Sequence, residues 1–309
     1  MFTILISDKL GEAGLELLEQ APDVTYAMQP GLSKAELLAI MPAYDALIIR
    51  SGTQVDADVI AAGTKLKIVG RAGIGVDNVD LAAAAAQGVV VMNTPGSNSV
   101  ATAEQTMTLM LAVSRHTVAA HNSVAAGEWQ RAQFSGVELF GKVLGIIGFG
   151  RIGRLVAERA QAFGMTVVAH DPYVQETDVP LVTLDALYAQ ADYITLHTAV
   201  TPETTNMINS ASINKMKNGV VIINVARGKL VNEADLAAAL QSGRVKAAAL
   251  DVYGSEPPAA DNPLINSPNV LHTPHLGAST VEAQRNVSTQ VVSQVLDALR
   301  GVEIRNAVK

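Results

Sequence analysis

Hydrophobic and polar residues follow two rhythms that alternate along the chain. Short runs rich in Val and Ile, typical of buried strands, are separated by stretches with the three- to four-residue apolar spacing of helices. The runs lie at 2–7, 46–50, 67–70 and 89–92, and then at 142–148, 165–171, 192–197, 219–225, 245–251 and 269–273. This alternation predicts an α/β fold with parallel sheets. The six runs of the second set suit a dinucleotide-binding sheet.

Several helices carry signals at their ends. An apolar stripe that begins at Ile152 stops before Gly164, and Asn232 and Gly243 bracket another helix as N-cap and C-terminal glycine. A long helical stretch is predicted at 99–126, between the two sets of strands. A last helix is predicted at 281–300, beyond the sixth strand of the second set.

Length and composition limit the classes of protein. A chain of 309 residues is long for one core, so two domains are expected. The net charge of −7 and the absence of a basic run argue against nucleic acid or an anionic membrane as partners. The lack of cysteine rules out disulfides, thiolate catalysis and cysteine-ligated zinc. Without a signal peptide or a membrane-length apolar stretch, we expect a soluble, cytoplasmic protein.

A glycine-rich loop has the pattern G-x-G-x-x-G, follows a predicted strand and opens a predicted helix. Its glycines permit a tight turn and let the backbone approach a pyrophosphate, whose charge the helix N-terminus favours. Asp171 ends the next strand, where it can accept hydrogen bonds from ribose hydroxyls and repel a 2′-phosphate, so NAD is expected rather than NADP. A structural turn with a surface aspartate is the alternative. The loop residues expected to bind NAD are Gly148, Gly150, Arg151, Ile152 and Gly153.

Three polar residues, Arg227, Glu256 and His275, come shortly after strand ends, where open α/β sheets place their ligands. A guanidinium binds a carboxylate through paired hydrogen bonds. An imidazole can take a hydroxyl proton while a carboxylate holds its other ring nitrogen and stabilises the imidazolium. The three together suit oxidation of a 2-hydroxy acid. Taken singly, each has an ordinary alternative as a surface cation, a loop acid or a structural histidine.

The segment HTPH contains two histidines, His272 and His275, that raise the possibility of a metal site. The intervening Thr-Pro favours extended chain, which sends nearby side chains apart, so no metal is expected and His272 is interpreted as structural. The remaining histidines are expected to be structural or on the surface: His116, His121, His170 and His197.

INVARG, DVYGSEPP and TPHLGAST resemble the three signature segments of the D-isomer-specific 2-hydroxyacid dehydrogenases, and RAGIGVDNVD and HTAVTPET extend the resemblance. It implies NAD as cofactor and catalytic roles for Arg227, Glu256 and His275. It also implies a Rossmann-type doubly wound parallel sheet domain at 97–282 and a smaller flavodoxin-like α/β substrate domain. The latter would comprise 1–96 and a C-terminal helix at 283–309, with a cleft between the domains. Further cofactor contacts are implied for Ile74, Thr198, Val225, Ala226, Asp251, Gly277 and Ala278.

NTPGSNSVATAEQT, GEWQRAQFSG and IRSGT resemble segments of those family members that oxidise 3-phospho-D-glycerate, the first step of serine biosynthesis. A phosphorylated 2-hydroxy acid needs cations beyond those for its carboxylate, and Arg50 and Arg131 are the candidates, with Arg71 a weaker third. A solvated surface position is the alternative for Arg131. Backbone amides of residues 73–75 are candidates for the carboxylate. The residues expected to bind substrate are Arg50, Ser51, Gly73, Gly75, Asn98 and Arg131.

Other interpretations stay open at this point. Ser97 and Ala199 stand where the family more often has glycine and proline, and a reductase of glyoxylate, hydroxypyruvate or another 2-keto acid would use the same three catalytic residues. An NAD(H)-sensing scaffold like the family's corepressors is a third possibility. The chain ends after one catalytic unit, so no regulatory domain is expected. Family members dimerise through the cofactor domain, and the apolar stretch 102–116 would suit a homodimer, although a helix buried within the subunit would look the same.

Overall fold

The computed structural model describes residues 1–267 and 269–308, so Lys309, the last residue of the predicted C-terminal segment, lies outside it. The chain forms two compact units, each described by itself below. The first unit comprises Met1–Asn98 and Ser279–Lys309, and the second unit comprises Ser99–Ala278. Each unit contains one six-stranded sheet. Among the described residues, no helix is both long enough and apolar enough to cross a membrane.

The sheet of the first unit has the strand order β12-β5-β4-β3-β1-β2. All neighbours pair in parallel except β12, which pairs antiparallel with β5. The order of the parallel strands is that of flavodoxin-like sheets. The strands span Phe2–Ile6 (β1), Val24–Met28 (β2), Ala46–Ile49 (β3), Ile68–Arg71 (β4), Val90–Met92 (β5) and Ala307–Val308 (β12).

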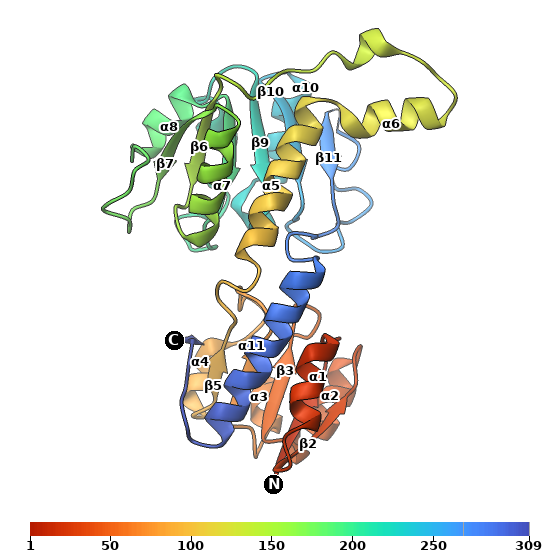
Figure 1. The fold of residues 1–309 in the computed structure, drawn as a ribbon, viewed down its shortest axis with the longest axis vertical. Helices are drawn as coiled ribbons and strands as arrows, with labels where there is room; N and C mark the ends of the chain where they lie inside the picture. Colours follow the sequence, from red (N-terminus) through yellow and green to blue (C-terminus); the bar gives the residue numbers. More distant parts are fainter. Residues whose placement is uncertain (268, 309) are drawn as a thin grey trace. The chain divides into compact units, whose positions relative to one another are not determined.

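Helices cover both faces of this sheet. Helix α11, from the C-terminal part of the chain, packs with α1 on one face, where Val291, Val292 and Val295 are completely buried; the blue α11 lies beside the red α1 in Figure 1. The other face is covered by α2, α3 and α4. The helices are α1 (Glu12–Glu19), α2 (Lys34–Ile40), the 3₁₀ turn η1 (Met41–Ala43), α3 (Ala57–Ala62), α4 (Leu81–Ala86) and α11 (Val281–Leu299).

The sheet of the second unit has the order β11-β10-β9-β8-β6-β7, with every pair parallel. A single parallel bridge between Ala169 and Leu181 adds one residue pair beyond β7, which completes the order of a doubly wound dinucleotide-binding sheet. The predicted fold class and the six predicted strands of this part are confirmed. The strands are Val143–Ile147 (β6), Thr166–His170 (β7), Tyr193–Leu196 (β8), Val220–Asn224 (β9), Val245–Leu250 (β10) and Val270–His272 (β11).

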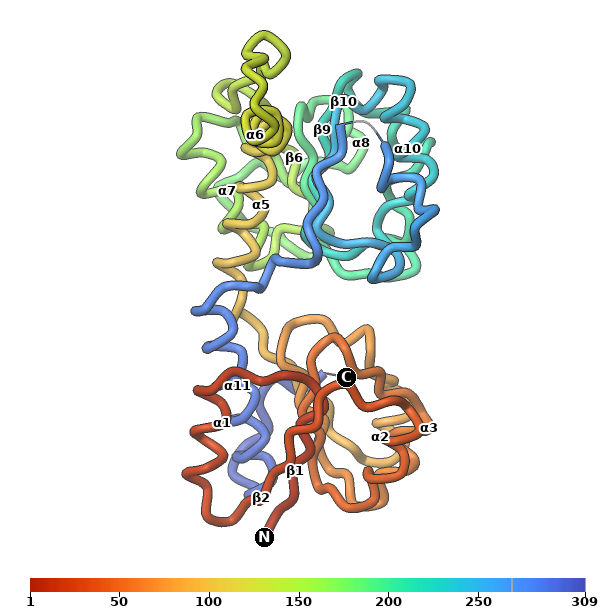
Figure 2. Tube along the Cα trace, turned by 90° about the vertical axis from the view of Figure 1, so that its right-hand side faces the viewer, coloured from red at the N-terminus to blue at the C-terminus, as the bar shows by residue number. Residues whose placement is uncertain are grey.

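Two helical layers enclose this second sheet. Helices α5 and α7 lie on one face and α8, α9 and α10 on the other, as the packing clusters show. Figure 2 shows α5 and α7 on the side of the sheet opposite to α8 and α10. The predicted N-cap Asn232 accepts a hydrogen bond from the amide of Asp235 at 3.1 Å. The elements are α5 (Ser99–Ser114), α6 (Thr117–Ala125), η2 (Arg131–Phe134), α7 (Arg151–Ala162), α8 (Leu184–Gln190), α9 (Ser210–Ile213), η3 (Gly228–Leu230) and α10 (Glu233–Gln241).

The prediction of one helix at 99–126 was wrong. Helix α5 ends at Ser114 and α6 begins at Thr117, because His116 adopts a left-handed backbone with φ of 51°. The amide of Val137 donates to the carbonyl of Ser114, so the chain returns to α5 at this break. Helix α6 has no buried residue, and with η2 it forms an arm that extends away from the sheet of the second unit (Figure 1).

Candidate active site

The glycine-rich loop connects β6 to α7 with little space to spare. Gly148 has φ of 92°, and a methyl group on it would lie 2.5 Å from the carbonyl oxygen of His197 and 2.8 Å from the amide nitrogen of Thr198. A methyl group on Gly153 would lie 2.3 Å from the carbonyl oxygen of Gly148. The loop is therefore compact and lies directly against Thr198, one of the predicted cofactor contacts.

The start of α7 has room for an anion. Gly150 is its N-cap and has no side-chain capping bond, and a methyl group on it would meet no atom within 4 Å. The first amides of α7, beginning at Arg151 and Ile152, are thus left with the partial positive charge of a helix N-terminus. This arrangement fits the pyrophosphate of a dinucleotide.

Asp171 lies where the sequence predicted it, directly after β7. One of its carboxylate oxygens accepts the amide of Phe149 at 2.8 Å, and the other accepts the amide of Tyr173 at 2.9 Å. The carboxylate therefore braces the glycine-rich loop and keeps lone pairs for further donors. A carboxylate at this position suits ribose hydroxyls as hydrogen-bond donors.

His275 and Glu256 form a hydrogen-bonded pair, with 2.6 Å between His275 Nδ1 and Glu256 Oε2. Burial raises the pKa of Glu256, but the hydrogen bond and charge of His275, the amide of Tyr253 and the charge of Arg227 outweigh it and leave the pKa below its usual 4.5. Glu256 is therefore a carboxylate at neutral pH. The structure thus brings two of the three predicted catalytic residues together, and the positive charge of the third, Arg227, helps to lower the pKa of Glu256.

Arg227 follows β9 in a short turn before η3, with its Nη1 donating to the carbonyl of Ala226 at 2.7 Å. Asn224, completely buried at the end of β9, holds this turn: its side chain accepts the amide of Ala226 at 3.0 Å and donates to the carbonyl of Arg227 at 2.9 Å. Sequence reasoning did not single out Asn224. A polar residue at the end of an otherwise apolar run was the available signal.

Asp251 fixes the loop that carries His275. Its carboxylate is completely buried and accepts the amides of Leu276 and Gly277, both at 2.8 Å, and the hydroxyl of Thr273. Its main-chain carbonyl accepts the amide of His275 at 2.8 Å. These bonds hold His275 in a left-handed conformation with φ of 55°, which costs a non-glycine residue about 1–3 kcal/mol.

The predicted cofactor contacts of this region lie close together. A methyl group on Gly277 would lie 3.1 Å from Val225 and 3.4 Å from the Asp251 carboxylate, so the turns after β9, β10 and β11 meet at this point. Ala226 follows Val225, and Ala278 ends the second unit. These turns all follow the carboxyl ends of their strands, as expected for a ligand site in this fold.

A second supporting residue, Glu233, also escaped sequence reasoning. Its carboxylate accepts the amide of Gly254 and the side-chain amide of Asn262, both at 2.8 Å. It therefore fastens the loop after β10 on both sides of Glu256. No local pattern marks it, because both partners lie more than twenty residues further along the chain.

The first unit contains most of the predicted substrate residues: Arg50, Ser51, Gly73, Gly75 and Asn98. It also contains the predicted cofactor contact Ile74. The amide of Arg50 donates to Asp8 at 2.6 Å. Arg50 is among the residues that line a cavity of about 750 Å³, together with Arg285, Glu12 and Glu16. Arg285 is a second cation here, which sequence reasoning did not consider.

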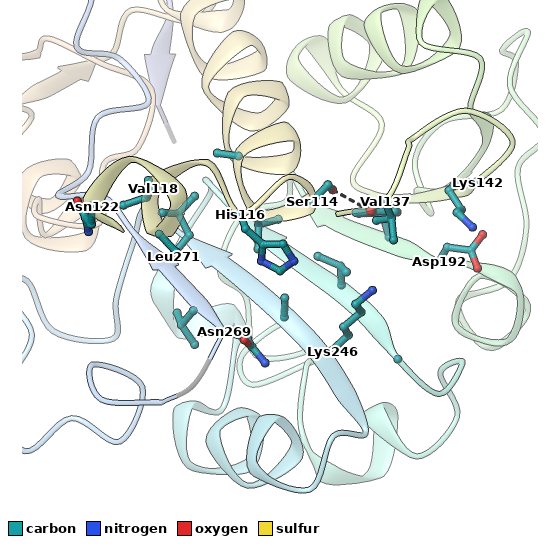
Figure 3. Close-up of a pocket in the computed structure, with 18 residues that line it drawn as sticks. Ser114, His116, Val118, Asn122, Val137, Lys142, Asp192, Lys246, Asn269 and Leu271 are labelled. Atoms are coloured by element: carbon teal, nitrogen blue, oxygen red, sulfur yellow. Dashed lines mark hydrogen bonds between the residues drawn. The ribbon is translucent and has the colours of Figure 1, made fainter. Parts of the chain in front are cut away.

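Arg131 is exposed as the first residue of η2 on the arm of the second unit. At the base of the arm, a cavity of about 450 Å³ opens beside the amino ends of the strands (Figure 3). Val118, Leu271, His116 and Lys246 are among its lining residues. It therefore lies at the edge of the sheet opposite to Asp171, Asp251 and His275.

His272 and His197 each have a partner of their own. His272 Nδ1 lies 2.7 Å from the hydroxyl of Tyr253, whereas the ring of His275 binds Glu256, so the two rings share no partner. Burial lowers the pKa of His197 to about 3, and its Nε2 lies 3.0 Å from the Thr195 hydroxyl. Within residues 1–267 and 269–308, no three acidic or histidine side chains are grouped as metal ligands would be.

Comparison with known proteins gives consistent matches. Residues 107–277 match the family described as D-isomer specific 2-hydroxyacid dehydrogenase, NAD binding domain. The chain is 44% identical to the D-3-phosphoglycerate dehydrogenase of Archaeoglobus fulgidus over 99% of its own length and 59% of that protein, and so spans little more than half of this relative. The TT0316 protein of Thermus thermophilus superposes with a TM-score of 0.93 at 36% identity, covering 99% of this chain and 100% of that one. A glyoxylate reductase from Paecilomyes thermophila gives 0.91 at 31% identity, covering 99% and 98%.

Proposed function

The chain belongs to the D-isomer specific 2-hydroxyacid dehydrogenase family, and on this premise we propose that it catalyses NAD-dependent oxidation of 3-phospho-D-glycerate to 3-phosphooxypyruvate. The observation that carries the proposal is the hydrogen-bonded His275–Glu256 pair beside the charge of Arg227. The similarity to a D-3-phosphoglycerate dehydrogenase over nearly the whole chain supports the choice of substrate.

In the proposed mechanism each residue has one task. Arg227 binds the substrate carboxylate through its guanidinium and polarises the neighbouring oxygen. His275 takes the hydroxyl proton at Nε2, because Nδ1 is engaged by Glu256, and the Glu256 carboxylate stabilises the imidazolium that forms. NAD, when bound, supplies the acceptor for the hydride. The α7 amides, the glycine-rich loop and Asp171 would hold it.

The choice of NAD over NADP depends on Asp171 in this proposal. Replacing Asp171 with Ala is expected to lower the ratio of kcat/KM for NAD to that for NADP by roughly ten- to a hundredfold, because the repulsion of a 2′-phosphate is removed. Steady-state rates with both cofactors measure this ratio. Asp185→Ala, at an exposed acid of the same unit paired with Lys215, is the control and should leave the ratio unchanged. An unchanged ratio in Asp171→Ala would contradict the ribose role.

The phosphate of the substrate requires further cations, and we assign Arg50 and Arg131 to it. Arg131→Ala is expected to reduce the preference for 3-phosphoglycerate over D-glycerate by about tenfold or more, since one charge-assisted hydrogen bond is lost. The ratio of kcat/KM for the two acids measures it. Lys215→Ala removes an exposed cation that is distant from Arg131 in the sequence, so this control should not change the ratio. If Arg131→Ala retains the full preference, the phosphate assignment fails.

The proposed function as a whole is tested by NADH formation across a panel of 2-hydroxy acids that includes 3-phosphoglycerate. Highest kcat/KM on 3-phosphoglycerate supports it. Preference for glycolate or D-glycerate would instead assign a reductase of glyoxylate or hydroxypyruvate, which the likeness to a glyoxylate reductase structure makes the second candidate.

We further propose that the protein is a homodimer formed through the second unit. The stretch 102–116 is a poor interface, because most of α5 is buried within its own unit. The arm is a better candidate: α6 has no buried residue, and Val118, Val124 and Trp129 are exposed on it or just after it. Sedimentation equilibrium would establish the oligomeric state. The cytoplasmic location stays a prediction.

A further inference from the structure

The loop after β4 is fastened to the end of β5 through two successive carbonyl groups. The carbonyl of Gly73 accepts the amide of Thr94 at 2.9 Å, and the carbonyl of Ile74 accepts the side-chain amide of Asn93 at 2.7 Å. In a trans peptide, the N–H of the next residue points opposite to the carbonyl. The N–H groups of Ile74 and Gly75 therefore both point away from the end of β5.

Two successive N–H groups on one side of the chain form a nest, a small concavity that binds anions. Positive charge lies at the same loop, because the Arg71 guanidinium is packed against Gly73: a methyl group there would lie 1.4 Å from Arg71 Nη1. A carboxylate is the substrate group that suits this arrangement. The sequence had indicated these amides as its partners without showing what orients them.

We propose that Asn93 is a positioning residue, which directs the Gly75 N–H at the substrate carboxylate by holding the Ile74 carbonyl. The proposal rests on the function proposed above, since it assumes a carboxylate substrate. Among the described hydrogen bonds, the side-chain amide of Asn93 is the only donor to the Ile74 carbonyl. Without it, the peptide between Ile74 and Gly75 can rotate, and one of the two N–H groups is lost to the anion.

Asn93 is itself held rigidly by the C-terminal part of the chain. Its amide donates to the carbonyl of Asn306 at 3.2 Å, and its carbonyl accepts the side-chain amide of Gln294 at 3.0 Å. Gln294 is buried on α11, and the side-chain amide of Asn306 donates to its Oε1. Both main-chain groups of Asn93 are therefore fixed, which holds the base of its side chain in place beside the loop.

The test replaces Asn93 with Asp, which has the same shape but turns the donor into a repelling acceptor, and with Ala. In both variants KM for 3-phosphoglycerate is expected to rise about 10- to 100-fold while kcat changes less than about threefold, the pattern of lost uniform binding. KM for NAD should change much less, because Ile74 is the one predicted cofactor contact in the first unit, whereas the glycine-rich loop and Asp171 belong to the second unit. A general loss of folded protein would lower the apparent kcat and would not raise KM for 3-phosphoglycerate alone.

Asp45→Asn is the matched control. Asp45 accepts the amide of Thr3 at 2.9 Å at the opposite, amino-terminal edge of the same sheet, so this variant should lose stability without a change in KM. Gln294→Met serves if the Asn93 variants do not fold: it frees the Asn93 carbonyl but keeps the Asn93 amide, and a rise in KM of about two- to fivefold is expected.

Calorimetric titration of oxalate into the NADH-saturated protein separates this proposal from the proposed function. Weaker oxalate binding by Asn93→Asp than by the wild type supports the role of Asn93, even if no 2-hydroxy acid is turned over and the proposed function fails. Unchanged KM and unchanged oxalate affinity in folded Asn93→Asp would overturn it. A wild-type protein that neither turns over a 2-hydroxy acid nor binds oxalate would overturn both.

Discussion

Replacing His275 with Ala is expected to lower kcat by about 10²–10⁴-fold, the usual contribution of a general base. The ring is the group that takes the proton in the proposed mechanism, and no other ring is bonded to Glu256 among the described residues. The loop itself should persist, because Asp251 holds it through main-chain amides that alanine retains. Steady-state kcat on 3-phosphoglycerate at saturating NAD measures the effect.

NADH affinity, followed by fluorescence titration, should stay within about threefold of the wild type in His275→Ala, which separates loss of chemistry from loss of the fold. Lys215→Ala, at an exposed residue of the same unit, is the control with unchanged kcat. A His275→Ala protein with wild-type kcat would remove the basis of the proposed mechanism. Glu256→Gln tests the partner: it keeps the shape but removes the charge, and kcat should fall by about tenfold or more.

The sheets were largely predictable because their strands are buried on both faces and read as continuous apolar runs. Strand β2 was missed, since it lies at an edge of its sheet and is only partly buried, with Thr25 and Met28 exposed. Strand β12 is two residues long and has no pattern of its own. The break at His116 was also unpredictable, because the helical periodicity continues across it and only the return of the chain at Val137 accompanies it.

The charged candidate residues of the site could be predicted from the sequence. The residues that hold their loops through hydrogen bonds became visible only in the structure. The end of a parallel strand is a recognisable place for a polar residue, so Asp171 and His275 stood out. Asn93 and Glu233 act through hydrogen bonds to main-chain groups of other loops, and their partners follow only from the folded chain. Asn224 instead holds its own turn through Ala226 and Arg227. The catalytic and binding roles of all these residues remain predictions for the experiments described above.

Gly228→Ala is expected to cause the largest loss of stability of the substitutions considered. A methyl group on Gly228 would lie 1.8 Å from the carbonyl carbon of Tyr253 and 1.9 Å from its oxygen, so main chain meets main chain and no side chain can yield. The turn of Arg227 is tied by Asn224, and the facing turn by Glu233. To admit the methyl group, the two turns must separate and these bonds must stretch or break.

We expect Gly228→Ala to lower the free energy of unfolding by about 3 kcal/mol or more and kcat/KM by about 100-fold, because Arg227 and Glu256 flank the contact and a shift of about 1 Å suffices for such a loss. Urea denaturation and steady-state kinetics measure the two effects. Gly254→Ala is the matched control from the same contact: its methyl group would find its nearest neighbour, the Glu233 carboxylate, at an ordinary 3.5 Å. Its stability should stay within about 1 kcal/mol of the wild type. Equal stability of the two variants would mean that the close approach at Gly228 does not hold Arg227 and Glu256 together.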